Sequence, residues 1–244
     1  MAARFSTTNW SLILRANASN SGVRRAALAE LCQAYWYPLY SFARRRGSGH
    51  DDASDLTQAF FVHLIEKHAL SGVAPTHGRF RSFLLASFKH FQSDVRDRLH
   101  ALKRGGDRIE VPWDTAVLET RYRAAASSGD DPEKLFDRQW ALTLIERARA
   151  RLRGEYASDA KTRDFEVLLP YLTQHGEKGS QELAAALGTT EGAARVALHR
   201  FKRRFGSALR AEVAATVDDP DQVESELRFL LEALGGPSRT PPEV

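Results

Sequence analysis

The stretch DDASDLTQAFFVHL, residues 51–64, decides the expected fold. Its apolar residues recur at intervals of three and four, the period of an amphipathic α-helix packed against a core. These residues are Ala53, Leu56, Phe60 and Leu64. A neighbouring side of the same helix carries Asp52, Asp55 and Gln58. An amide held among acids suggests a partner helix, whereas a solvated acidic face is the simpler alternative.

Helical spacing continues along the chain, without the sustained alternation of β-branched residues that is typical of strands. Pro38 is expected to break or kink the first helix, and the paired glycines of KRGGDR to stop the third. The expected helices span about residues 23–46, 51–69, 79–104, 132–153, 159–174, 180–187, 190–205 and 221–234. The sequence therefore predicts an all-α fold.

Two small helical domains joined by a flexible linker are expected, the second of them containing a helix-turn-helix. Residues 105–131 are assigned to the linker because VPWD and AAASSGDDP are small and polar, with little periodicity. The other parts are an N-terminal segment at 1–22, the first domain at 23–104, the second domain at 132–213 and an acidic C-terminal extension at 214–244.

Composition restricts the class of protein. The chain has 244 residues, of which 43% are hydrophobic and 27% charged, which is enough to bury one or two cores. The single cysteine, Cys32, excludes an internal disulfide and a cysteine-based zinc site, and fits a reducing cytoplasm. Because no apolar run reaches membrane-spanning length, we expect a soluble cytoplasmic protein without membrane insertion.

Charge is distributed unevenly along the chain, which has a net charge of +4. Residues 78–108 contain eight Lys and Arg against three acids, and residues 191–212 contain six against two. Residues 213–244 contain seven acids against two basic residues. Two separated basic helices are the expected footprint of a protein that binds two pieces of one DNA. The acidic segment is expected to be a solvated helix, with a mobile shield for the basic helix as the alternative.

The segment SQELAAALGTTEGAARVALHRFKRRF, residues 180–205, predicts two helices separated by a short turn. Ser180 is expected to cap the first helix and Gly188 to end it, and Thr189 or Thr190 to cap the second. The apolar stripe of the second helix comprises Ala194, Leu198, Phe201 and Phe205. Its basic side carries Arg195, His199, Lys202 and Arg203. Such a helix fits the DNA major groove, although a solvated basic face on a helical hairpin is the alternative.

Signs of catalysis are sparse. His90 and Asp94 are four residues apart, but one histidine and one acid make a poor metal site. The chain has no phosphate-binding glycine loop and no nucleophile elbow. We therefore expect no enzyme activity, no catalytic residue, no metal and no cofactor. A nuclease acting through carboxylates is the enzyme alternative.

The stretch at 51–66 resembles the core-binding helix of bacterial RNA polymerase sigma factors, which has an acid-rich start followed by Asp-Leu-x-Gln-x-x-Phe. Asp55, Leu56, Gln58 and Phe61 match this pattern. The segment FRSFLLASFKHFQSDVRDR resembles the family's minus-ten element reader, and residues 180–205 are similar to its minus-thirty-five reader. The resemblance covers roughly residues 20–100 and 135–213, and the extracytoplasmic-function group matches best.

The resemblance implies a function in transcription initiation, with core RNA polymerase and promoter DNA as partners. Members of the group often bind an anti-sigma factor or another regulator as well. The implied core-polymerase contacts are Asp52, Asp55 and Gln58. The implied minus-ten contacts are Lys89, His90, Arg96 and Arg98, where His90 stands in place of the family's common Asn. The implied minus-thirty-five contacts are Thr190, Arg195, His199, Lys202 and Arg203. The alternative function is a helix-turn-helix regulator that does not bind core polymerase.

Overall fold

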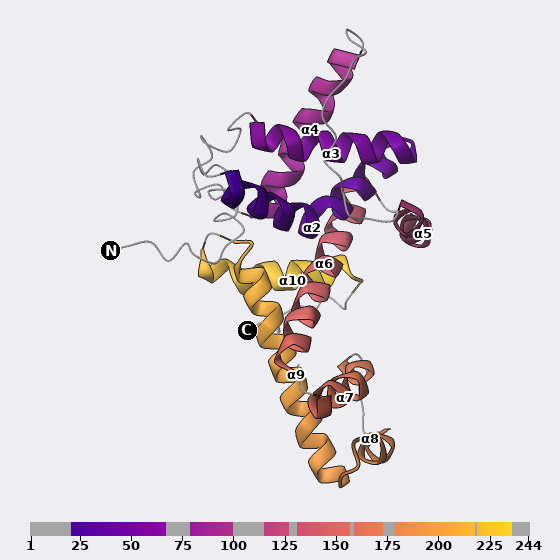
Figure 1. Ribbon diagram of the computed structural model, residues 1–244, viewed down its shortest axis with the longest axis vertical. Helices are drawn as coiled ribbons and strands as arrows, with labels where there is room; N and C mark the ends of the chain where they lie inside the picture. Colours follow the sequence, from indigo (N-terminus) through magenta and orange to yellow (C-terminus); the bar gives the residue numbers. More distant parts are fainter. Residues whose placement is uncertain are drawn as a thin grey trace, which may run out of the picture. The chain divides into compact units, whose positions relative to one another are not determined.

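The computed structural model describes residues 21–66, 79–99, 115–126, 131–156, 159–172, 179–217 and 219–235. Within these ranges every regular element is a helix and none is a strand, which confirms the all-α prediction (Figure 1). The N-terminal segment at 1–20 and most of the expected turn after the second helix lie outside the described residues.

The predicted helices begin within about two residues of the expected positions, whereas the described part of α4 ends at Leu99, earlier than predicted, α9 continues nine residues beyond 205, and α5 was not predicted. Their bounds are α2 Ser21–Arg45, α3 His50–Glu66, α4 Phe80–Leu99, α5 Thr115–Ala126, α6 Pro132–Glu155, α7 Asp159–Leu168, the 3-10 turn η1 Leu169–Leu172, α8 Ser180–Leu187, α9 Glu191–Ala214, the 3-10 turn η2 Pro220–Gln222 and α10 Val223–Ala233. Helix α2 continues through Pro38 without a break. It ends before Gly47, whose φ of 94° lies in the left-handed region that favours glycine.

The chain divides into two compact units. The first unit comprises Met1–Thr143 and Ala214–Val244, and the second comprises Leu144–Val213. This division differs from the expected domain boundaries, because the first unit continues through the expected linker to residue 143 and also contains residues 214–244. The start of α6, at 132–143, belongs to the first unit, and so does the C-terminal segment that contains α10.

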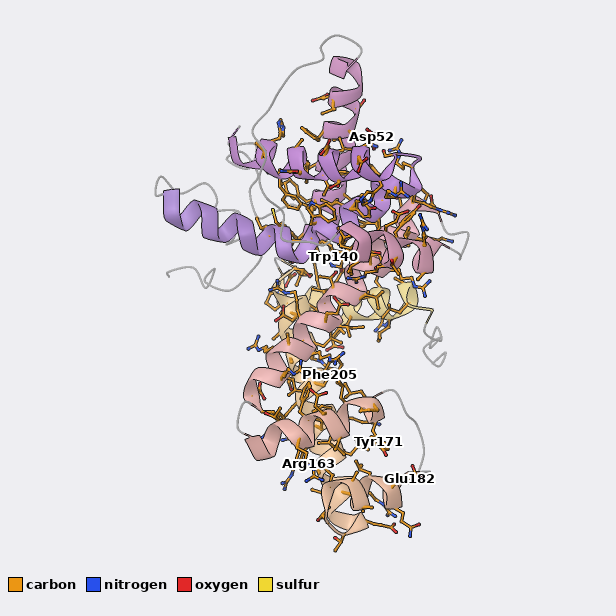
Figure 2. The ribbon with its side chains drawn as sticks, turned by 45° about the vertical axis from the view of Figure 1, so that its right-hand side comes forward. Asp52, Trp140, Arg163, Tyr171, Glu182 and Phe205 are labelled. Carbon is orange, nitrogen blue, oxygen red and sulfur yellow. The ribbon has the colours of Figure 1, made fainter. Side chains whose placement is uncertain are left out.

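Aromatic packing explains why the start of α6 belongs to the first unit. The ring of Trp140 from α6 stacks on Tyr35 from α2, with centroids 4.3 Å apart and planes inclined by 13°. Phe80, at the start of α4, lies 6.0 Å from Trp140 and 5.3 Å from Tyr35. All three side chains are completely buried, and Trp140 is labelled in Figure 2. Large aromatic side chains contribute much of the apolar area that a small core can bury, so this cluster joins three helices.

Helix α5 forms within the expected linker, so the linker is not unstructured throughout. Its sequence, TAVLETRYRAAA, is rich in residues of high helix propensity. Leu118 is buried, and Glu119 contacts side chains of α2 and α3. The stretches VPWD and SSGDD on either side of α5 suggest a linker, but the segment between them is a helix held by tertiary contacts.

The second unit has its own core, built from the end of α6 and from α7, α8 and α9. Its central contact is between Phe165 of α7 and Phe201 of α9, whose rings meet at 70° with centroids 5.6 Å apart. Tyr156 packs on both rings. The buried members of this core are Leu152, Phe165, Leu168, Leu183, Ala184, Ala194 and Phe201. Phe205, labelled in Figure 2, packs against them from the next turn of α9.

Candidate functional site

Helix α3 has one buried side and one acidic side. Its buried residues are Ala53, Thr57, Phe60, Phe61 and Leu64. Leu56, predicted for the apolar stripe, is half-buried, and Thr57 takes the interior position instead. The Thr57 hydroxyl donates to the Ala53 carbonyl at 2.7 Å, so its burial leaves no unmet donor.

The acidic side of α3 lies at the protein surface. Asp52 and Asp55 are exposed and Gln58 is half-buried. Spacings of three residues place all three on neighbouring turns of one face. Asp51 and Asp52 stand in the first turn, where the positive end of the helix dipole favours carboxylates. The described structure therefore brings the three predicted residues together beside, rather than inside, the core.

A polar network connects α5 to the beginning of this helix. The Tyr40 hydroxyl of α2 donates to Glu119 Oε2 at 3.1 Å and lies 2.7 Å from Nδ1 of His50, the first residue of α3. Because the hydroxyl has one proton and gives it to Glu119, His50 must donate from Nδ1 in this arrangement. Arg44 donates to Glu119 Oε1 at 2.9 Å.

The network perturbs two pKa values in opposite directions. Burial raises the pKa of Tyr40 above its ordinary value, and the hydrogen bond to Glu119 raises it further. Burial also acts to raise the pKa of Glu119, but hydrogen bonds from Arg123 and Tyr40 and the charge of Arg44 outweigh it and lower that pKa. Glu119 is therefore held as a carboxylate. No local sequence pattern indicates this network, because Glu119 is 79 residues from Tyr40.

The start of α4 carries two arginines that face the C-terminal segment. Arg81 Nε lies 2.6 Å from Oε1 of Glu226 on α10, and Arg81 NH1 lies 2.9 Å from Asp137 on α6. Arg79 forms a second ion pair with Glu226 at 2.9 Å. The Phe229 ring centroid is 3.8 Å from the Arg81 guanidinium carbon. We call these five side chains the Arg81 cluster.

The Arg81 cluster corrects the expectation that the acidic segment is a solvated helix. Glu226 is completely buried and Arg81 is 7% exposed, so each charge depends on the other for compensation. Burial raises the pKa of Asp137, against the opposing charge of Arg81. The backbone N–H of Phe80 also donates to the Thr216 carbonyl at 3.0 Å, which satisfies a donor at the N-terminus of α4.

The predicted minus-ten residues lie further along α4. Lys89 is half-buried, pairs with Glu133 of α6, and has its Nζ 5.8 Å from the Phe42 ring centroid. His90 is exposed. Arg96 and Arg98 belong to the last turns of α4, but their side chains lie outside the described residues. Lys89 therefore already has an acidic partner within the first unit.

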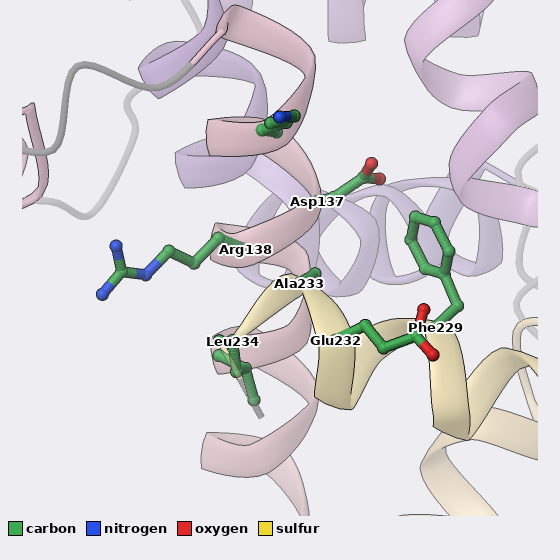
Figure 3. A pocket seen from close by; sticks show the side chains of 8 residues that line it. Asp137, Arg138, Phe229, Glu232, Ala233 and Leu234 are labelled. Atoms are coloured by element: carbon green, nitrogen blue, oxygen red, sulfur yellow. The ribbon is translucent and has the colours of Figure 1, made fainter. Parts of the chain in front are cut away.

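A cavity of about 570 Å³ opens between α6 and α10 in the first unit (Figure 3). Lys134, Arg138, Glu232 and Leu234 are among its lining residues. Figure 3 shows Arg138 and Asp137 extending in opposite directions from α6. The lining has charges of both signs, and none of the predicted site residues belongs to it.

The connection between α8 and α9 is three residues long. The residue before α8 is Gly179, with φ 119°, and no side chain caps this end. The prediction that Ser180 is the N-cap is therefore wrong: Ser180 is the first helical residue, because the backbone before it takes a conformation that glycine favours. Gly188, with φ 63°, ends α8 as predicted. Thr190 Oγ1 accepts from the Ala193 N–H at 3.3 Å and so caps α9.

Helix α9 presents most of its predicted contact residues to solvent. Thr190, Arg195, His199 and Arg203 are exposed, and Lys202 is half-buried. Arg195 lies 3.4 Å from Glu191 one turn earlier. The buried side of α9 is marked by Ala194 and Phe201. With 3.6 residues per turn, His199 and Arg203 lie within about 30° of the direction opposite to that side. Arg195 and Lys202 lie about 70–90° from that opposite direction.

Among the described residues no three His, Cys, Asp or Glu side chains form a group that could hold a metal ion. No helix in the described ranges is both long enough and apolar enough to cross a membrane. Burial raises the pKa of the Cys32 thiol to about 12, which makes it a poor nucleophile.

Comparison with known proteins gave no relative. No family model matches the chain, and neither a curated protein nor a solved structure is similar to it at a significant level.

Proposed function

We propose that this protein is an RNA polymerase sigma factor, similar to the extracytoplasmic-function group, that acts in the cytoplasm. In this proposal it binds core polymerase, directs it to promoters and helps to open the DNA. The observation that carries the proposal is the exposed acidic face of α3, in the stretch that has the DLTQAFF motif. The protein acts by binding, without enzymatic activity or a cofactor.

The surface of α3 suits a basic protein partner. Its apolar side is occupied by the core of the first unit, so the carboxylates of Asp52 and Asp55 are not needed there. Opposite charges across an interface increase the association rate and select the partner. Half-buried Gln58 adds an amide that can both donate and accept at the edge of the same face.

Helices α8 and α9 support a role in DNA recognition. Their three-residue connection, the Thr190 cap and the separate core of the second unit support the proposal that they form a helix-turn-helix. In this proposal α9 enters the major groove of the minus-thirty-five element with Arg195, His199 and Arg203. Guanidinium groups can pair bidentately with guanine edges or with phosphates.

Helix α4 is the proposed reader of the minus-ten element. Exposed His90 and the Lys89 ammonium lie on neighbouring positions, and Arg96 and Arg98 continue the basic sequence towards the end of the helix. A polyanion that approaches Lys89 must compete with Glu133. Single-strand binders stabilise unpaired bases with cationic and aromatic groups, so promoter opening is the step that should depend most on this helix. An anti-sigma factor or another regulator is a further proposed partner.

Reconstitution with core polymerase tests the proposal. The protein should give promoter-specific transcripts from DNA selected by the complex, and Asp55→Arg with Gln58→Ala should weaken core binding at least tenfold. Glu232→Arg, which reverses an exposed charge on α10, is the matched control and should bind normally. Specific DNA binding without any effect on core polymerase would favour the helix-turn-helix regulator instead. Unchanged core binding by the α3 variant would remove the basis of the interface.

A further inference from the structure

Val196 is an apolar residue on the exposed side of α9. Its exposed fraction is 50%, and it is one of three large apolar side chains that are exposed among the described residues. The other two, Val117 and Leu231, belong to the first unit. Valine is a weak helix former because its branched side chain loses rotamer freedom in a helix. Neither helix propensity nor burial in the second unit therefore explains a valine at this position.

The surroundings of Val196 on α9 are basic and open. Helical spacing places Gly192, His199 and Arg200 one turn away from it and Arg203 two turns away, and all four are exposed. Val196 lies within about 30° of the direction opposite to Ala194 and Phe201, so it is near the middle of the exposed face. No described residue pairs with Arg200 or Arg203 through an ion pair. The valine therefore lies one turn from the Arg200 guanidinium and two turns from that of Arg203, with only small residues on its N-terminal side.

Gly192 leaves the backbone at the beginning of α9 uncovered by a side chain. A Cβ atom added there would meet nothing within 4 Å, so the glycine leaves open space on the exposed face one turn before Val196. Ala193 beside it is also small and exposed. A partner surface can therefore approach the backbone at the beginning of α9, and Val196 is the first large apolar side chain that it would meet.

The partner that fits both the charge and the valine is duplex DNA. Its phosphates complement the surrounding arginines, and its major groove offers one apolar group, the C5-methyl of thymine. A protein partner would need an acidic surface with an apolar centre, for which the described residues give no further support. We propose that Val196 is a specificity-determining residue that packs on a thymine methyl group in the upstream promoter element. This inference rests on the proposed DNA-binding role of α9.

Replacement of thymine by deoxyuridine tests the proposal, because it removes the methyl group and leaves the hydrogen-bonding edge unchanged. DNA is first selected from a randomised library by the full-length protein, both with core polymerase and without it. Each thymine of the selected upstream element is then replaced singly, and binding by the wild type and by Val196→Ala is measured. The wild type should lose about fourfold in affinity at one position, the loss expected for one methyl group removed from an apolar contact.

Val196→Ala should bind the unmodified site about fourfold more weakly and should be insensitive to deoxyuridine at that position. Val117→Ala, which truncates an exposed valine of the first unit, is the matched control and should respond as the wild type does. Equal responses of wild type and Val196→Ala at every thymine would overturn the proposal, even if the complex transcribes. If the protein selects a DNA sequence by itself, shows the expected response at Val196 and has no effect on core polymerase, this inference is supported while the sigma-factor proposal fails. If neither condition enriches a sequence, both proposals fail.

Discussion

Arg81 at the start of α4 lies 2.6 Å from Glu226 of α10, a residue 145 positions later in the chain. This pair makes the C-terminal segment part of the first unit, although all of the second unit lies between the two residues in the sequence. Both side chains are buried, so the pair cannot be treated as a surface salt bridge. Its loss should leave a charge without compensation inside the protein.

Glu226→Ala should lower the free energy of unfolding by about 3–5 kcal/mol, because Arg79 and Arg81 then lose a buried partner. Glu232→Ala removes an exposed acid of the same helix and should change stability by less than about 0.5 kcal/mol. Urea unfolding followed by circular dichroism measures both. If Glu226→Ala does not fold, Arg81→Met with Glu226→Leu and Asp137→Asn should restore a folded protein, since Asp137 also pairs with Arg81 and no buried charge of the pair or of Asp137 then remains without a partner. A fully stable Glu226→Ala protein would contradict the assigned role of the pair.

Glu119 predicts a pH dependence of stability. Its folded-state pKa is lowered, so its contribution to stability is fully present above the unfolded pKa of about 4.3 and is lost as the pH falls through the folded value. Glu119→Gln should therefore be less stable than the wild type at pH 7, and the difference should shrink between about pH 5 and pH 2. Glu182→Gln, at an exposed position of α8, is the control. A stability difference that does not vary with pH would indicate that Glu119 acts by packing alone.

Lys89 and Glu133 provide a test of the proposed minus-ten surface. Lys89→Ala, combined with Arg96→Ala and Arg98→Ala, should reduce permanganate-detected promoter opening more than it reduces binding to core polymerase. Glu133→Gln should increase affinity for DNA, because it releases the Lys89 ammonium to bind a phosphate. One additional phosphate contact should make the slope of log affinity against log salt concentration steeper by about one. Normal opening by the triple variant would show that these charges do not contact the melted strand.

Local patterns predicted the elements that need few distant contacts. The three-and-four spacing in residues 51–64 predicted α3, and Gly188 with Thr190 predicted the connection before α9. The same reasoning missed α5 and the packing of α10, because Glu119 and Glu226 pair with Arg44 and Arg81, which lie 75 and 145 residues away in the chain. It also placed Leu56 in the core instead of Thr57, whose hydroxyl is satisfied within its own helix. Polar residues with long-range partners leave no periodic signal in a sequence.

Arg195 and Lys202 separate base recognition from phosphate binding on α9. We expect Arg195 to read a base, since it is near the N-terminus of the helix and a planar guanidinium can pair bidentately, whereas the Lys202 ammonium should act as a point charge on phosphate. Arg195→Ala should therefore relax preference at one position of the upstream element, where the wild type discriminates by about 1–3 kcal/mol. Lys202→Ala should weaken binding to all sites alike and reduce the slope of log affinity against log salt concentration by about one.

Glu191 pairs with Arg195 in the free protein, so Glu191→Ala should increase affinity without changing the preferred base. Site selection from a randomised upstream element measures each preference, and the same selected motif for the wild type and Arg195→Ala would assign Arg195 to phosphate instead.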